Sequence, residues 1–187
     1  MAGFPVQRTS MYKGVDLSSA AVPLSFNDQV VAGNVILVFS SGWNIAENGS
    51  VLGAVRDNVG NVYKRLVTSS GQSHGYIEIF AAVNTTTSNI TLTLIPAVNN
   101  LSTRISVQGV EWVGIEDIQV LAQTATGYAQ PNANSLHLAT GPSLQKQNLL
   151  VISALGMLWP QPTKNIVKPP EYTLLEAVQS TPANEMS

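Results

Sequence analysis

Two short runs of this sequence are apolar at nearly every position. Residues 35–39 read Val-Ile-Leu-Val-Phe, and residues 149–155 read Leu-Leu-Val-Ile-Ser-Ala-Leu. Successive side chains of a β-strand point to opposite faces, so a strand of this kind must be covered on both faces. We therefore predict that both runs are central strands, not edges. We also expect a neighbouring subunit to cover part of the face that points away from the core.

The rest of the chain is divided by turn residues into short segments with strand-like alternation. Further strands are predicted at residues 20–26, 51–55, 62–67, 76–82, 90–94, 104–113, 118–126 and 172–178. Pro23 cannot donate to a ladder, which predicts an edge strand, and Gly109 indicates a bulge or bend. Ser40 to Asn44 is expected to be a polar loop. No sustained 3.6-residue period occurs, so the fold class is all-β, a β-sandwich or jelly-roll-like domain.

The composition limits the possible functions. Of 187 residues, 44% are hydrophobic and only 11% are charged, and the net charge is −2. A sizeable core is therefore possible, but there is no basic stripe for binding nucleic acid. There is no cysteine, hence no disulfide or thiolate site. No apolar stretch approaches the roughly 18 residues that span a bilayer, and residues 1–10 lack the apolar core of a secretory signal.

Residues 1–16 differ from the rest because they mix apolar and polar types without a period. We predict an extended N-terminal arm at 1–16, which is either a frayed terminus or a segment that orders only against a neighbouring subunit, and a single β-domain at 17–187. Within the arm, Phe4, Met11 and Tyr12 are the candidate interface residues. Val38, assigned to the outer face of the first apolar run, is the candidate interface residue of the domain.

Several segments together resemble a recurrent β-sandwich module of tailed-phage virion proteins and bacterial surface proteins. They are Asn34-Val35-Ile36-Leu37-Val38, Asp57-Asn58-Val59-Gly60-Asn61-Val62-Tyr63 and Val110-Glu111-Trp112-Val113-Gly114. Shorter matches occur at residues 77–82 and 148–151. The likeness covers roughly residues 17–178, and its motifs are structural. The resemblance implies an architectural or adhesive role and carries over no catalytic residue.

The expectation that follows is a non-enzymatic structural protein of a tailed-phage virion. Within that class we favour a capsid decoration, or cement, protein on the capsid surface, forming a homotrimer and binding the major capsid protein. The alternative is a receptor- or carbohydrate-binding domain of a tail fibre, in which Trp43, Tyr128 and Trp159 stack on sugar rings. No cofactor, metal, nucleic acid or membrane is expected as a partner.

Two groups of residues are candidate chemical sites, and each also has a structural explanation. Asp57, Asn58 and Asn61 carry oxygen ligands that suit calcium, but their spacing favours a hairpin turn. Glu111, Glu116 and Asp117 would supply the paired carboxylates of a glycosidase, whereas solvated loop and turn positions are the favoured interpretation. His74 and His137 lie in Ser-, Gly- or Asn-rich segments and are interpreted as surface loop residues.

Overall fold

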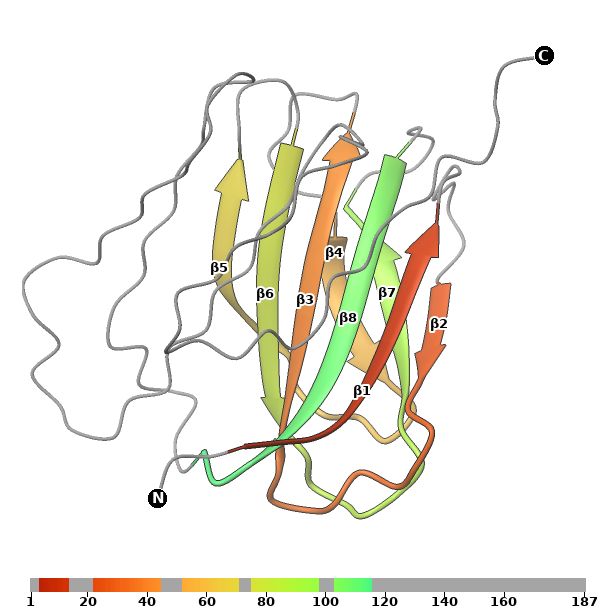
Figure 1. The fold of residues 1–187 in the computed structure, drawn as a ribbon, viewed down its shortest axis with the longest axis vertical. Helices are drawn as coiled ribbons and strands as arrows, with labels where there is room; N and C mark the ends of the chain where they lie inside the picture. Colours follow the sequence, from red (N-terminus) through yellow and green to blue (C-terminus); the bar gives the residue numbers. More distant parts are fainter. Residues whose placement is uncertain (1–3, 14–21, 45–51, 71–74, 98–102, 116–187) are drawn as a thin grey trace, which may run out of the picture.

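The computed structural model describes residues 4–13, 22–44, 52–70, 75–97 and 103–115. Within this part of the chain there are eight β-strands and no helix (Figure 1). The strands are β1 (Phe4–Lys13), β2 (Val22–Ser25), β3 (Val35–Asn44), β4 (Leu52–Asp57), β5 (Lys64–Ser70), β6 (Gly75–Val83), β7 (Thr91–Pro96) and β8 (Thr103–Val113). The all-β fold class is confirmed for these residues.

The strands form two antiparallel sheets. One has five strands in the order β1-β8-β3-β6-β5, and the other has three in the order β2-β7-β4; in Figure 1 the smaller sheet lies behind the larger. The first apolar run is therefore the middle strand of the larger sheet, as predicted. Pro23 lies in β2, an edge strand of the smaller sheet, also as predicted. The second apolar run, residues 149–155, and the predicted strands 118–126 and 172–178 lie outside the described residues.

One cluster of buried side chains draws residues from both sheets. Its members include Leu24 of β2, Val38 of β3, Phe80 of β6, Leu92 of β7 and Val107 of β8. The alternation of β7 is the clearest source of this core: Leu92 and Leu94 are buried, while Thr91 and Thr93 are more exposed. The hydrophobic effect therefore joins the two sheets through their facing surfaces.

A second buried cluster lies on the opposite face of the five-stranded sheet. It contains Val35, Leu37, Ala81, Val110 and Trp112. Register places them on one face, because Leu37 pairs with both Ala81 and Val110, and Val35 pairs with Trp112. This reverses the face assignment made from sequence. Val38 is fully buried in the core between the sheets, so it does not offer the outward-facing contact expected of it.

The N-terminal segment also differs from expectation. Phe4–Lys13, assigned to an arm outside the domain, forms β1 and pairs with β8 from Phe4 opposite Val113 to Lys13 opposite Ile105. A register shift between Pro5 and Gln7 interrupts the ladder once. The physical reason is that β8 would otherwise leave one row of backbone groups without partners, and a non-local strand satisfies them.

Two smaller expectations are corrected. Ser40 to Asn44 is not a loop, because β3 continues through Asn44 in register with both β6 and β8. Gly109 is not at a bulge, since its pairing is regular with both Val38 and Thr9. Instead a Cβ at Gly109 would lie 3.0 Å from Leu92 Cδ1 and 3.1 Å from Phe26 Cζ. A side chain at position 109 would therefore be crowded, and its neighbours would have to shift to make room for it.

Candidate functional site

Three connections meet at one end of the molecule, and we call them together the loop platform: residues 26–34, 57–63 and 84–90. Strand pairing brings their ends together, because Val35 pairs with Val83, Ser25 with Thr91, and Asp57 with Leu92. The start of β1 and the end of β8 lie at the same end (Figure 1). Loops held on a rigid scaffold are where binding residues commonly lie, so the platform is the first place to look for function.

Asp57 organises the 57–63 loop. Its Oδ1 accepts backbone N–H groups from Val59 (3.1 Å), Gly60 (2.8 Å) and Asn61 (3.0 Å). Its Oδ2 accepts the Asn61 amide at 2.7 Å and the Tyr63 hydroxyl at 2.9 Å. Gly60 has φ of 84°, which a residue without a Cβ adopts without strain. The turn predicted here from the sequence is confirmed, but it does not close a hairpin: β4 pairs with β7 and β5 with β6, so the loop passes from one sheet to the other.

The same contacts decide against the calcium interpretation of this loop. Both Asp57 oxygens already accept hydrogen bonds from five donors, and a cation would have to displace them. In the described part of the chain there is no group of three or more His, Asp or Glu side chains that would hold a metal ion. Asp57 therefore acts as an acceptor that shapes the loop.

Asn61 and Asn84 carry the network from the 57–63 loop to the 84–90 loop. Asn61 Nδ2 donates to Asn84 Oδ1 at 2.9 Å, and Asn61 Oδ1 accepts the backbone N–H and the hydroxyl of Thr85, each at 3.0 Å. Beneath them, burial and then the neighbouring Asp57 carboxylate raise the pKa of the Tyr63 hydroxyl. Tyr63 therefore stays protonated and donates to Asp57.

Asn84 and Asn58 complete the links between the loops. Asn84 Nδ2 donates to the carbonyls of Val30 (2.9 Å), Val31 (3.2 Å) and Thr86 (2.9 Å). Asn58 donates to Asn89 O and accepts from Thr91 N, each at 2.9 Å. All three loops are thus joined by side-chain amides that bond backbone groups of the neighbouring loops.

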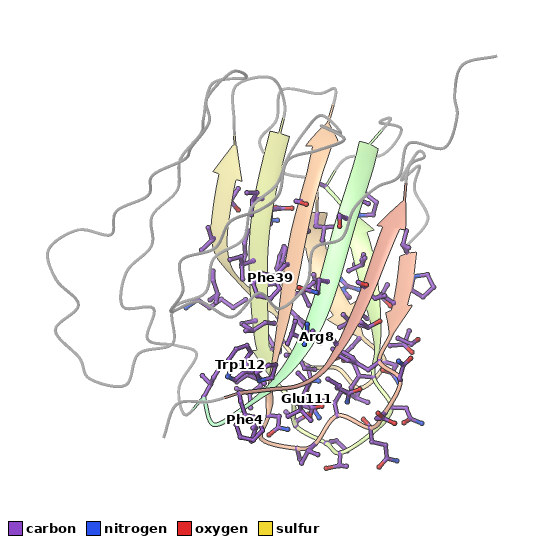
Figure 2. All side chains as sticks on the ribbon, viewed as in Figure 1. Phe4, Arg8, Phe39, Glu111 and Trp112 are labelled. Carbon is purple, nitrogen blue, oxygen red and sulfur yellow. The ribbon has the colours of Figure 1, made fainter. Side chains whose placement is uncertain are left out.

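Glu111 anchors the other side of the platform and lies completely buried near the end of β8 (Figure 2). Its Oε1 accepts Asn34 Nδ2 at 2.6 Å and Val31 N at 2.9 Å, and its Oε2 accepts Gln7 Nε2 at 2.7 Å. Gln7 also contacts the 26–34 loop, donating to the carbonyl of Asp28 and accepting from its N–H, each at 3.2 Å. The carboxylate therefore joins β1, β8 and the loop.

This buried role was missed from the sequence, which assigned Glu111 to a solvated position. One signal was present: Glu111 has the same parity as Ile105 and Val107 in the predicted strand, so it had to face the core with them. Its partners, Asn34 and Gln7, are 77 and 104 residues away in the chain, and no local pattern identifies them.

A second buried glutamate, Glu78 of β6, lies on the same inner face. Its Oε2 accepts Leu52 N at 2.8 Å, and its Oε1 lies 3.5 Å from the guanidinium of Arg65. Arg65 also lies over the Phe80 ring, 5.1 Å from its centroid, and donates to Leu52 O. This set fixes the start of β4 against β5 and β6.

The two buried glutamates are not placed as a hydrolytic pair. Glu111 pairs with Ile36 and Glu78 with Ser40, four positions along β3, which corresponds to about 13 Å. Glycosidase carboxyl groups lie about 5 to 9.5 Å apart. Glu116 and Asp117, the other acids considered, lie outside the described residues, as do His74 and His137.

The remaining predicted site residues differ in their exposure to solvent. Phe4 is exposed at the start of β1, whereas Val38 is buried. Met11 and Tyr12 lie in β1, and Trp43 lies in β3. Tyr128 and Trp159, the other two residues of the sugar-stacking alternative, lie outside the described residues.

Searches for similar proteins return no match: no family model, no curated protein and no solved structure resembles the chain. Among the described residues, no helix is long and apolar enough to cross a membrane.

Proposed function

We propose that this protein is a non-enzymatic structural component of a tailed-phage virion, a decoration protein on the capsid surface. In this proposal the two sheets form a β-sandwich or jelly-roll-like domain. The protein forms a homotrimer and binds the major capsid protein, and the free energy of binding across capsomer seams stabilises the shell.

One observation carries this proposal: Asp57, Glu78 and Glu111 each accept hydrogen bonds that fix strands and loops. Acids used in this way are held by their donors and serve to rigidify a scaffold. The low charge of the chain, 11% of residues, supports the same conclusion, because weakly charged surfaces suit burial in an assembly.

The N-terminal segment retains a role in this proposal. β1 is an edge strand of the five-stranded sheet, and its first residues, Phe4 and Val6, are exposed. An exposed apolar segment at a sheet edge is suited to contact a neighbouring subunit or the shell. The arm expected from the sequence is thus replaced by a strand that belongs to the domain and presents its beginning outward.

The experiment that tests this function is quantitative mass spectrometry of purified virions. A decoration protein is present in many copies, in a fixed ratio to the major capsid protein. A few copies per particle would place the protein in the tail and favour the carbohydrate-binding alternative. A glycan array with Trp43→Ala, Tyr128→Ala and Trp159→Ala variants then separates the two: sugar binding by the intact protein that these changes abolish would replace the capsid proposal.

A further inference from the structure

β1 is attached to the domain differently from the other strands. Its side chains are described for residues 4–10, and none of these is buried or belongs to either hydrophobic cluster. Every other strand of the described part has at least one side chain in a cluster or packed against one; examples, from β2 to β8 in order, are Leu24, Leu37, Val55, Leu66, Phe80, Leu92 and Val107. The described part of β1 therefore adds little to the hydrophobic core.

Hydrogen bonds hold β1 in place instead. Its backbone pairs with β8 along the whole strand, with one register shift. Gln7 Nε2 donates to Glu111 Oε2 at 2.7 Å, and Thr9 Oγ1 donates to the carbonyl of Ser25 at 2.7 Å. Each of these bonds replaces a bond to water, so its net contribution to stability is small compared with the burial of a large apolar side chain. β1 is thus recognised by the edge of β8 and by a few polar groups beside that edge.

These partners lie far from β1 along the chain. Glu111 is 104 residues from Gln7, and Ser25 is 16 residues from Thr9. Residues 14–21 connect β1 to β2, and a connection of this length spans at most about 28 Å when extended. A β1 strand from another copy of the chain would make the same hydrogen bonds. Exchange of an identical element between subunits is a low-cost route to an oligomer.

The two buried clusters also form without the described side chains of β1. Their members come from β2 to β8 and from the connections between those strands. β1 pairs with a strand about a hundred residues later in the chain, and such non-local pairing forms slowly. A β1 strand and an open edge of β8 are therefore available together when subunits meet, and an open edge is a template for a strand from another chain.

We propose that copies of this chain exchange β1. The strand of each chain pairs with β8 of the next, and around a three-fold axis the exchange closes into a ring. The occupant of the β8 edge is then a second copy of the chain, and the bond between Gln7 and Glu111 joins two subunits. This inference rests on the proposed function, because it names the contact that holds the homotrimer together.

The test uses introduced thiols, which report the chain that supplies β1 because the sequence has no cysteine. Ser10 lies opposite Gln108 in the ladder, and opposed residues of antiparallel strands have Cα atoms about 4.5–5.5 Å apart, within disulfide range. Full chains carrying Ser10→Cys are mixed with heavy-isotope-labelled chains carrying Gln108→Cys, unfolded together in urea, refolded and oxidised. Mass spectrometry should find disulfides that join position 10 of an unlabelled chain to position 108 of a labelled chain.

The matched control pairs Ser10→Cys with Thr68→Cys, at an exposed site of β5 on the opposite edge of the same sheet, and measures chance collisions. The opposed pair should give at least about tenfold more cross-linked product than this control, because its two thiols are held together. Circular dichroism establishes that each variant is folded. Tyr12→Cys with Ser106→Cys, a second opposed pair, repeats the measurement where the first pair does not fold.

Three results would overturn the inference. The first is a full chain that stays monomeric at about 100 µM in sedimentation velocity. The second is a yield from the opposed pair that is no higher than that of the control. The third is a chain carrying both Ser10→Cys and Gln108→Cys whose disulfides, formed in the oligomer, all lie within single chains. The copy number in virions is measured separately, so the capsid proposal survives or fails on its own.

Discussion

Neutralising Glu111 should destabilise the protein strongly, because this buried carboxylate joins β1, β8 and the 26–34 loop. In Glu111→Gln one oxygen still accepts from Asn34 and Val31, but the new NH2 group faces Gln7 Nε2, a donor against a donor. A hydrogen bond to a charged group contributes about 1.5–3 kcal/mol, and the two retained bonds also weaken when the charge is lost.

Allowing for the lower desolvation cost of a neutral side chain, we expect the free energy of unfolding to fall by about 2–4 kcal/mol. In a domain of this size, a loss of about 3 kcal/mol lowers Tm by about 6–12 °C. Urea unfolding of the full chain at pH 7, followed by tryptophan fluorescence, measures the change directly.

The matched control is Asp28→Asn, which makes the same chemical change at an exposed position of the same platform. It should alter stability by no more than about 0.5 kcal/mol. Combining Gln7→Ala with Glu111→Gln should cost less than the two single changes summed, because both remove the same bond. A Glu111→Gln variant as stable as the unchanged protein would refute the view that this carboxylate fixes the platform.

Other regions give further predictions. Burial and Asp57 raise the pKa of the Tyr63 hydroxyl above its usual 10.0, so the unfolded chain loses this proton first and the free energy of unfolding falls above about pH 10. Tyr63→Phe should lessen that fall in alkaline urea titrations, and an equal fall in both proteins would contradict this role of Tyr63. Gly109→Ala should cost about 1–3 kcal/mol by overpacking, and an unchanged Tm would show that the sheets can move apart. Deleting residues 1–13 should lower the free energy of unfolding by more than about 2 kcal/mol, since Glu111 loses Gln7; unchanged urea unfolding would mean that β1 behaves as a detachable arm. Val38→Asp should prevent folding, as judged by circular dichroism, and a folded variant would contradict its place in the core.

Local patterns predicted the elements whose structure is decided locally. The run at 35–39 required cover on both faces and is the middle strand β3, and the alternation of β7 gave its buried side. The turn at Asp57 was predicted because its carboxylate bonds backbone N–H groups two to four residues ahead.

What the sequence did not reveal depends on distant partners. β1 has no clear alternation, and its strand character comes from pairing with β8 about a hundred residues later in the chain. The inner and outer faces of β3 were assigned the wrong way round, because a strand that is apolar at every position has no polar residues to mark its exposed face. Gly109 looked like a bulge because sequence alone does not show that another sheet packs against it.

For the same reason, the sequence predicted only part of the candidate site. Asp57, Asn58 and Asn61 were identified, but as a local turn. Their connection to Asn84, 23 residues from Asn61, appears only when two loops that each pass from one sheet to the other meet. The turn at residues 57–63 is therefore part of the loop platform.

The claim that the buried network pre-orders the loop platform is tested most directly by hydrogen exchange of its backbone amides in the full chain. The informative amides are those of Val31, Gly60, Asn61 and Thr85, which donate to side chains and not to a strand ladder. The account predicts that they exchange as slowly as amides of the central strand β3. Exchange at the rate of an unstructured loop would contradict it.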